Sequence, residues 1–164
     1  MNHDSYDDNL IGSILNTVRT VAMVGASANN VRPSYFVLKY LSAKGFTVFP
    51  INPGRAGGQI GGLPCYASLA DVPEPIDMVD VFRAADAVPG VIDDALALPQ
   101  RPKVIWLQLG IRNDDAAAVA EAAGVTVIQN RCPKIEYGRL SGEISWTGVN
   151  SRRVSAKRPK RMEG

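Results

Sequence analysis

The chain has 164 residues, of which 46% are hydrophobic and 21% are charged, as expected of one globular domain with its own core. No apolar run approaches the roughly 20 residues that cross a bilayer, and the acidic N-terminus lacks the order of a signal peptide. The formal net charge of +2 combines 15 acidic and 12 basic side chains in residues 1–150 with one acidic and six basic in residues 151–164.

The composition indicates the compartment of the protein and the part of the chain that folds. Two cysteines make no disulfide framework, so we expect a cytoplasmic protein with no membrane partner. Residues 1–150 are expected to form the domain, and residues 151–164 a basic, flexible tail. Such tails are more often solubilising ends than readers of nucleic acid, so nucleic acid is not an expected partner.

The predicted elements alternate between helices and strands along the chain. After an opening helix over residues 8–17 come five apolar runs, at residues 21–24, 47–51, 78–82, 104–109 and 125–129. They are near-continuous in Val, Ile, Leu, Met and Phe, which is typical of parallel strands covered on both faces. Further helices are expected at residues 34–44, 87–97 and 114–123. The pattern predicts a single Rossmann-like, doubly wound α/β domain with about five parallel strands.

One stretch of the chain interrupts this alternation. Residues 55–75 are rich in glycine and proline and have no clear period. We expect them to form a loop with a short turn near residues 68–71.

The first apolar run ends in a small-residue loop with the character of an anion site. Gly25, Ala26 and Ser27 follow the run, and Arg32-Pro33-Ser34 opens the next helix. Free backbone N–H groups and the positive end of a helix dipole attract phosphate at such a junction. The loop departs from the dinucleotide fingerprint Gly-x-Gly-x-x-Gly, because Ser27 and Asn30 occupy its second and third glycine positions.

The residues after the other runs extend this candidate site, because ligands of open α/β sheets bind beyond the carboxyl ends of the strands. Asn52 and Pro53 follow the second run, where a protein that reads the ribose of NAD usually has a carboxylate, so NAD is disfavoured. Arg32 and Arg83 are candidate phosphate partners through forked hydrogen bonds. The same edge carries Gln108, Gly110, Asn130 and Arg131.

Residues able to perform acid–base or nucleophilic chemistry are few. The only histidine, His3, is expected in a mobile N-terminal segment, and no cysteine or histidine cluster has metal-ligand spacing. No catalytic residues and no metal site are therefore predicted. Cys132 has basic neighbours that favour a reactive thiolate, although a small buried thiol is the simpler interpretation. Asp80 and Glu136 are candidate acid or base groups, although lone carboxylates near strand ends more often form structural ion pairs, which we expect here.

Six short motifs occur in order between residue 10 and Leu140. They are Val24-Gly-Ala-Ser27, Arg32-x-Ser34, Asn52-Pro53, Asp77-x-x-Asp80-Val-Phe-Arg83, Trp106-Leu-Gln108-x-Gly110 and Arg131-Cys-x-Lys-Ile-Glu136. Together they resemble the family of small CoA-binding proteins, whose single Rossmann-like domain is similar to the CoA-binding domain of the succinyl-CoA synthetase alpha subunit.

The resemblance implies that coenzyme A lies across the carboxyl edge of the sheet. Its pyrophosphate would approach Gly25, Ala26 and Ser27, with three further residues near phosphate: Asn30, Arg32 and Ser34. The nucleotide or pantetheine would be bordered by Asn52 and Pro53, and the rest of the groove by Phe82, Arg83, Gln108 and Gly110.

Two departures from the family limit what the resemblance implies. Tyr137 stands where the family often has histidine. The second domain of the ligase, with its phosphorylated histidine, has no counterpart here, so ligase activity by this chain alone is not expected.

We therefore expect a non-catalytic or regulatory module that binds coenzyme A or an acyl-CoA, with a protein partner that the sequence does not identify. The first alternative is a nucleotide-dependent enzyme that acts with a partner, either an oxidoreductase or a component of a CoA transferase or ligase. The fold supports that alternative, whereas Ser27 and Asn52 count against it. The second alternative is redox sensing, with Cys132 exchanging disulfides with the CoA thiol.

Overall fold

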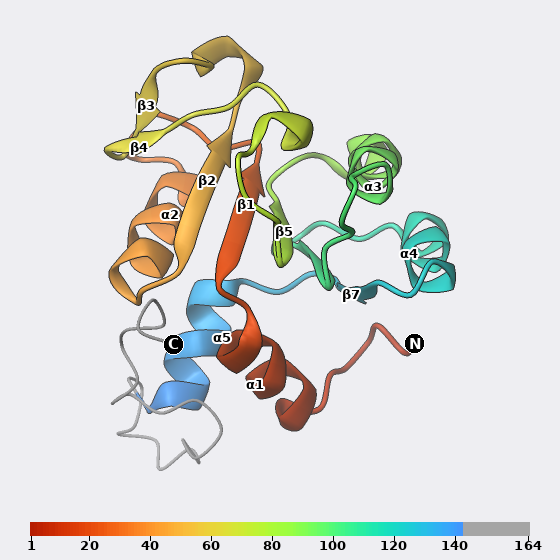
Figure 1. Ribbon diagram of the computed structural model, residues 1–164. Coiled ribbons are helices and arrows are strands. Elements are labelled where there is room, and N and C mark those ends of the chain that lie inside the picture. The colour runs from red at the N-terminus through yellow and green to blue at the C-terminus, as the bar shows by residue number, and fades with distance from the viewer. Residues whose placement is uncertain (143–164) are drawn as a thin grey trace.

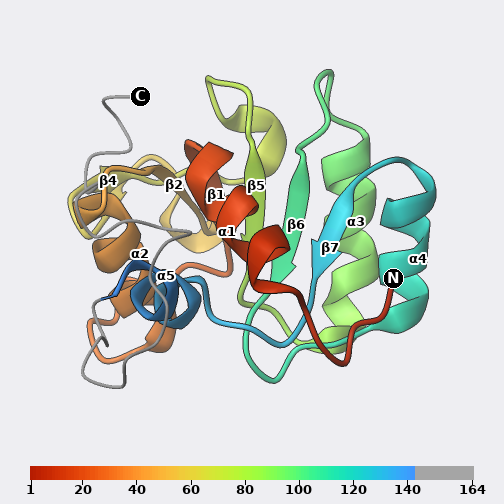
Figure 2. The ribbon, with the colours of Figure 1, turned by 90° about the horizontal axis from the view of Figure 1, so that it is seen from below.

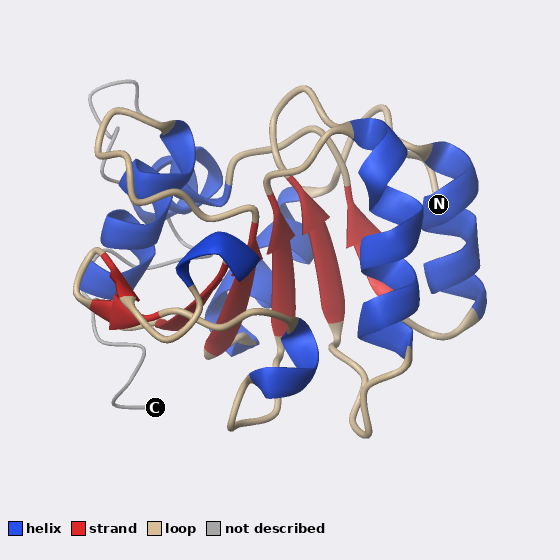
Figure 3. Cartoon of the chain, turned by 90° about the horizontal axis from the view of Figure 1, so that it is seen from above, coloured by secondary structure: helices blue, strands red, loops and turns tan. Residues whose placement is uncertain are grey.

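The structure is a computed structural model that describes residues 1–142. A five-stranded parallel sheet, red in Figure 3, forms its centre. Its strand order is β2-β1-β5-β6-β7 (Figure 2). The strands are β1 (Thr20–Val24), β2 (Thr47–Ile51), β5 (Met78–Val81), β6 (Val104–Leu107) and β7 (Thr126–Ile128). This arrangement confirms the expected Rossmann-like α/β fold. The expected basic tail, residues 151–164, and the end of the expected domain lie outside the described residues.

Helices cover both faces of the sheet (Figures 1 and 2). One face packs against α1 (Asp8–Thr17), α2 (Pro33–Ala43) and α5 (Pro133–Ser141), and the other against α3 (Val88–Leu96) and α4 (Asp114–Ala122). Side chains alternate between the faces along each strand, so that Met23 joins the first core and Val24 the second. Within the described residues, no helix is long and apolar enough to cross a membrane.

The helix ends follow ordinary capping chemistry. Asp7 accepts a hydrogen bond from the Asn9 amide at the start of α1, and Asn113 does the same for Ala116 at the start of α4. The expected helix at residues 87–97 is present as a short 3₁₀ turn, η3 (Ala85–Ala87), that leads into α3. Helix α5 was not predicted from the sequence.

The glycine- and proline-rich segment is more ordered than expected. It contains η1 (Pro53–Arg55), a two-stranded hairpin of β3 (Gln59–Ile60) and β4 (Leu63–Pro64), and η2 (Leu69–Asp71). The turn expected near residues 68–71 is confirmed as η2. Gly61 and Gly62 join the hairpin strands with φ values of 57° and 83°, a conformation that favours glycine.

The N-terminal segment is fixed along β7, so the expectation that His3 is mobile was wrong. His3 is 7% exposed, and its Nδ1 lies 2.7 Å from the hydroxyl oxygen of Tyr6. That oxygen also accepts a hydrogen bond of 2.8 Å from the backbone amide of Gln129, just after β7. The guanidinium of Arg131 lies 5.0 Å from the centre of the Tyr6 ring. These contacts anchor a segment whose polar composition alone predicts disorder.

Candidate functional site

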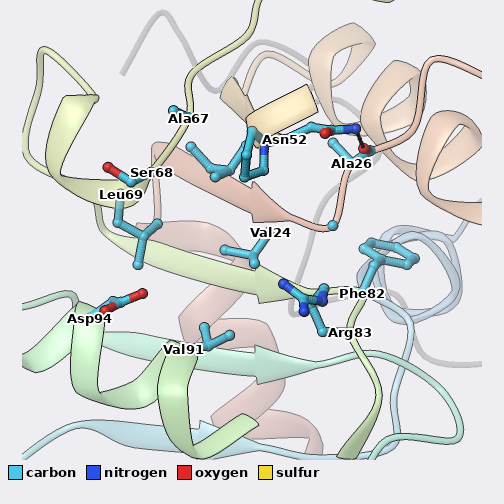
Figure 4. A pocket seen from close by; sticks show the side chains of 13 residues that line it. Val24, Ala26, Asn52, Ala67, Ser68, Leu69, Phe82, Arg83, Val91 and Asp94 are labelled. Atoms are coloured by element: carbon cyan, nitrogen blue, oxygen red, sulfur yellow. Dashed lines mark hydrogen bonds between the residues drawn. The ribbon is translucent and has the colours of Figure 1, made fainter. Parts of the chain in front are cut away.

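The order of strands in the sheet reverses between β1 and β5. The chain passes from β1 outward to β2, then crosses back to β5 on the other side of β1. A crevice forms at the carboxyl ends of the strands where such a reversal occurs, and ligands of open α/β sheets bind there. Here a cavity of about 400 Å³ lies against the ends of β1, β2 and β5 and against α3 (Figure 4). We call it the switch-point cavity. Six of the expected site residues line it: Gly25, Ala26, Asn52, Pro53, Phe82 and Arg83.

Gly25 is required by a close approach within the protein itself. Its φ is +85°, and a Cβ at this position would overlap the backbone carbonyl of Phe82. The Phe82 amide in turn donates a 2.8 Å hydrogen bond to the Val24 carbonyl. The glycine therefore lets the end of β1 lie directly against the end of β5, which sets the floor of the switch-point cavity.

The first three backbone amides of the loop after β1 donate to acceptors within the protein. Gly25 and Ala26 both donate to the Ile51 carbonyl, at 3.2 and 3.3 Å, and Ser27 donates to the Ser34 hydroxyl at 3.2 Å. These three amides are not free, contrary to what the sequence predicted for the loop, and binding of phosphate by the loop stays a prediction. The loop is braced against β2 and α2, and an anion at this edge would also meet side-chain donors.

Arg83 supplies such a donor. It follows β5 and is exposed, and within residues 1–142 its guanidinium forms no hydrogen bond or ion pair. Figure 4 shows Arg83 at the end of β5 and Asp94 on α3, both lining the cavity. An unpaired guanidinium with five N–H donors suits a phosphate oxygen, whereas the Asp94 carboxylate suits hydroxyl groups.

Asn52 lines the same cavity but is committed to the protein. Its Nδ2 donates to the Ala26 carbonyl at 2.9 Å, and its Oδ1 accepts from the Gly54 amide at 2.9 Å. The first of these bonds is drawn as a dashed line in Figure 4. Asn52 therefore joins the loops after β1 and β2 and fixes the shape of the cavity wall.

A second cavity, of about 420 Å³, lies at the ends of β5 and β6 and at the start of α2. We call it the β6 cavity, and its lining consists of Pro33, Phe82, Arg83, Ala84, Gln108, Leu109 and Ile111. It shares Phe82 and Arg83 with the switch-point cavity. Most of its lining is apolar. The side chain of Gln108 is the buried polar group, since the residue is 7% exposed and its Oε1 has no hydrogen-bond partner in the described residues.

The other expected site residues lie around these cavities. Asn30 and Arg32 are exposed in the loop before α2, and Ser34 is buried in the first turn of that helix. Gly110 has a φ of +81° after β6, and its amide donates a 2.7 Å hydrogen bond to Asn130. Their contact with a ligand stays a prediction.

Sequence reasoning missed one wall of the switch-point cavity. That wall is formed by η2 and α3 and consists of Ala67, Ser68, Leu69, Val91 and Asp94. None of these residues immediately follows a strand of the parallel sheet, so the strand-end rule does not find them. The expected turn at residues 68–71 was the available signal.

The candidate catalytic groups are mostly buried. Cys65 and Cys132 both have buried thiols, whereas disulfide exchange needs an accessible thiolate. Glu136 forms the expected ion pair, with Arg139 at 2.9 Å. For Asp80 the expectation was wrong: it is fully buried, and neither carboxylate oxygen has a hydrogen-bond partner among the described residues. Burial raises the pKa of the Asp80 carboxyl well above its usual value.

Tyr137 has a place in the core. It is 1% exposed, and its ring makes edge-to-face contacts with Tyr40 and Phe46, with centroids 6.1 and 6.0 Å apart. Tyr137, which stands where the family often has histidine, therefore packs α5 against α2.

Fold and site together define a Rossmann-like α/β domain with two adjoining cavities at the carboxyl edge of its sheet. Residues 19–138 match the family described as the CoA binding domain. The match spans most of the described chain, and the protein belongs to this family.

Similar proteins include chains of about this size. An uncharacterized Bacillus subtilis protein, YneT, is 32% identical over 127 residues, which are 77% of this chain and 91% of that protein. The solved structure of a hypothetical protein from Pyrococcus horikoshii OT3 is 33% identical with a TM-score of 0.79 and covers 85% of this chain and 96% of its own.

Longer enzymes contain a similar region. ADP-forming acetate–CoA ligase I of Archaeoglobus fulgidus is 25% identical over 142 residues, which are 82% of this chain and 20% of the ligase. A dinucleotide-forming acetyl-coenzyme A synthetase from Ca. Korarchaeum cryptofilum, solved with phosphate and ADP, is 25% identical with a TM-score of 0.57. That alignment covers 73% of this chain and 27% of the synthetase. This chain therefore corresponds to a minor part of each enzyme.

Proposed function

We propose that the protein binds coenzyme A or an acyl-CoA as a non-catalytic or regulatory module. The observation that carries the proposal is the position of Arg83, which lines both cavities at the strand ends and whose guanidinium has no partner among residues 1–142. Coenzyme A has a nucleotide at one end, a long arm at the other and a diphosphate between them. The Arg83 guanidinium between the switch-point cavity and the β6 cavity matches this order of nucleotide, diphosphate and arm. Membership of the CoA-binding family supports the same ligand.

Titration calorimetry with coenzyme A, 3′-dephospho-CoA and NAD tests the proposal. We expect heat from coenzyme A and weaker binding of NAD, because no carboxylate stands at Asn52 to hold the NAD ribose. Arg83→Gln should weaken CoA binding about tenfold or more through the loss of a charge-assisted hydrogen bond. Arg101→Gln removes the same charge from an exposed position that lines neither cavity and should leave the affinity unchanged. Absence of heat from coenzyme A, or tighter binding of NAD, would overturn the proposal.

A second function, as the CoA-binding component of a ligase, is favoured by the similarity to the ADP-forming acetate–CoA ligases. In this case another chain would supply the remaining domains and the catalytic groups. Acetyl-CoA formation from acetate, ATP and coenzyme A would then appear only when this protein is mixed with the partner that co-purifies with it. A co-purified mixture that turns over no substrate would count against this function.

A further inference from the structure

The β6 cavity differs in chemistry from the switch-point cavity that it adjoins. Gln108, Leu109 and Pro33 belong to its lining and not to that of the switch-point cavity. Leu109 is 51% exposed although it is apolar, and this gives the mouth of the cavity an accessible hydrophobic surface. The Gln108 Oε1 is buried there without a hydrogen-bond partner in the described residues, which costs free energy unless a ligand supplies a donor.

The direction of a bound ligand follows from the topology. In Rossmann-like sheets the residue after the second strand meets the adenosine ribose, and the rest of the ligand crosses the switch point. Here that residue is Asn52, in the wall of the switch-point cavity, and Asp94 adds an acceptor for hydroxyl groups. The adenosine half therefore fits the switch-point cavity, the diphosphate meets Arg83, and the arm enters the β6 cavity.

From this order the geometry points to an acyl thioester of coenzyme A as the preferred ligand. This inference rests on the proposed function. The acyl group lies in the β6 cavity against Leu109, Ile111 and Pro33. The Gln108 Oε1 accepts a hydrogen bond from an amide N–H of the pantetheine arm. An arm with a free thiol would leave much of this apolar surface in contact with water, whereas an aliphatic acyl group covers it.

Titration with coenzyme A and its acetyl, butanoyl and hexanoyl thioesters measures the acyl contribution. We expect affinity to rise roughly twofold to fourfold per added methylene, the upper value being that of full burial. Leu109→Ser should abolish most of this rise. Val119→Ser is the matched control, because Val119 is 53% exposed on α4 and lines neither cavity.

Gln108→Leu tests the polar contact without emptying the site. We expect it to weaken the binding of coenzyme A about threefold to tenfold and to leave adenosine 3′,5′-bisphosphate, which lacks the arm, unaffected. Coenzyme A that binds with no dependence on the acyl chain, or with the same dependence in Leu109→Ser, would overturn this inference and leave the proposed function standing. A protein that binds neither coenzyme A nor its thioesters would overturn both.

Discussion

Asn52 illustrates how one side chain can shape a site through hydrogen bonds within the protein. Its amide joins the loops after β1 and β2 through the Ala26 carbonyl and the Gly54 amide. Asn52→Asp keeps an acceptor for Gly54 but places a carboxylate oxygen against the Ala26 carbonyl. We expect it to lower the free energy of unfolding by about 1–3 kcal/mol, as measured by urea denaturation. The same substitution at exposed Asn30 should change it little. If Asn52→Asp changes the free energy of unfolding as little as Asn30→Asp does, the Asn52 bridge between the two loops is dispensable.

Gly25 gives a second prediction at this scale. Gly25→Ala meets both an unfavourable positive φ and the Phe82 carbonyl, whereas Gly124→Ala has a similar φ of +88° and open space around its Cβ. We expect Gly124→Ala to cost about 1–2 kcal/mol of unfolding free energy from the backbone conformation. Gly25→Ala should cost about 1–3 kcal/mol more from the overlap. Thermal and urea unfolding of the two variants measure the difference, and similar losses would contradict a close contact between β1 and β5.

The elements that sequence patterns predicted are those whose apolar residues form long runs. All five strands of the parallel sheet and helices α1, α2, α3 and α4 were predicted in this way. Helix α5 was missed because its buried positions include Pro133, Gly138 and Ser141, which leave too few large apolar side chains to mark a helical stripe. The wall of the switch-point cavity from η2 and α3 was missed for another reason. The connection from β2 to β5 brings Ser68 to the strand ends, and the connection from β5 to β6 brings Asp94 there, so neither residue follows a strand directly.

The N-terminal segment is an element held by a few polar contacts, and it can be tested through Tyr6. Tyr6→Phe removes the acceptor of the Gln129 amide and the partner of His3. We expect faster hydrogen exchange at the Gln129 amide and a loss of about 1–3 kcal/mol in its protection. Tyr35→Phe is the control, because the Tyr35 hydroxyl has no hydrogen bond within the described residues. Unchanged exchange at Gln129 would mean that the segment does not protect the edge of β7.

At the scale of the whole molecule, the buried carboxyl of Asp80 links the stability of the sheet to pH. It lies on the middle strand, β5, paired with Met23 of β1 and Trp106 of β6, both fully buried. Because burial raises its pKa well above the unfolded value, the folded protein retains a proton that the unfolded chain releases above about pH 4. The contribution of Asp80 to stability is therefore complete at lower pH and declines as pH rises toward the pKa of the folded state.

Asp80→Asn replaces this carboxyl with a neutral group of nearly the same shape and should remove that decline. We expect the unfolding free energy of the unsubstituted protein to fall as the pH rises above about 5, with an Asp80 contribution of up to about 1.4 kcal/mol per pH unit. Urea titrations from about pH 5 upward should show a flatter profile for Asp80→Asn than for the unsubstituted protein. Asp115→Asn, which neutralises an exposed carboxylate, should leave the slope unchanged. Parallel profiles for Asp80→Asn and the unsubstituted protein would mean that Asp80 is ionised in the folded sheet, which would require a cation or a donor that reaches it between β1 and β6.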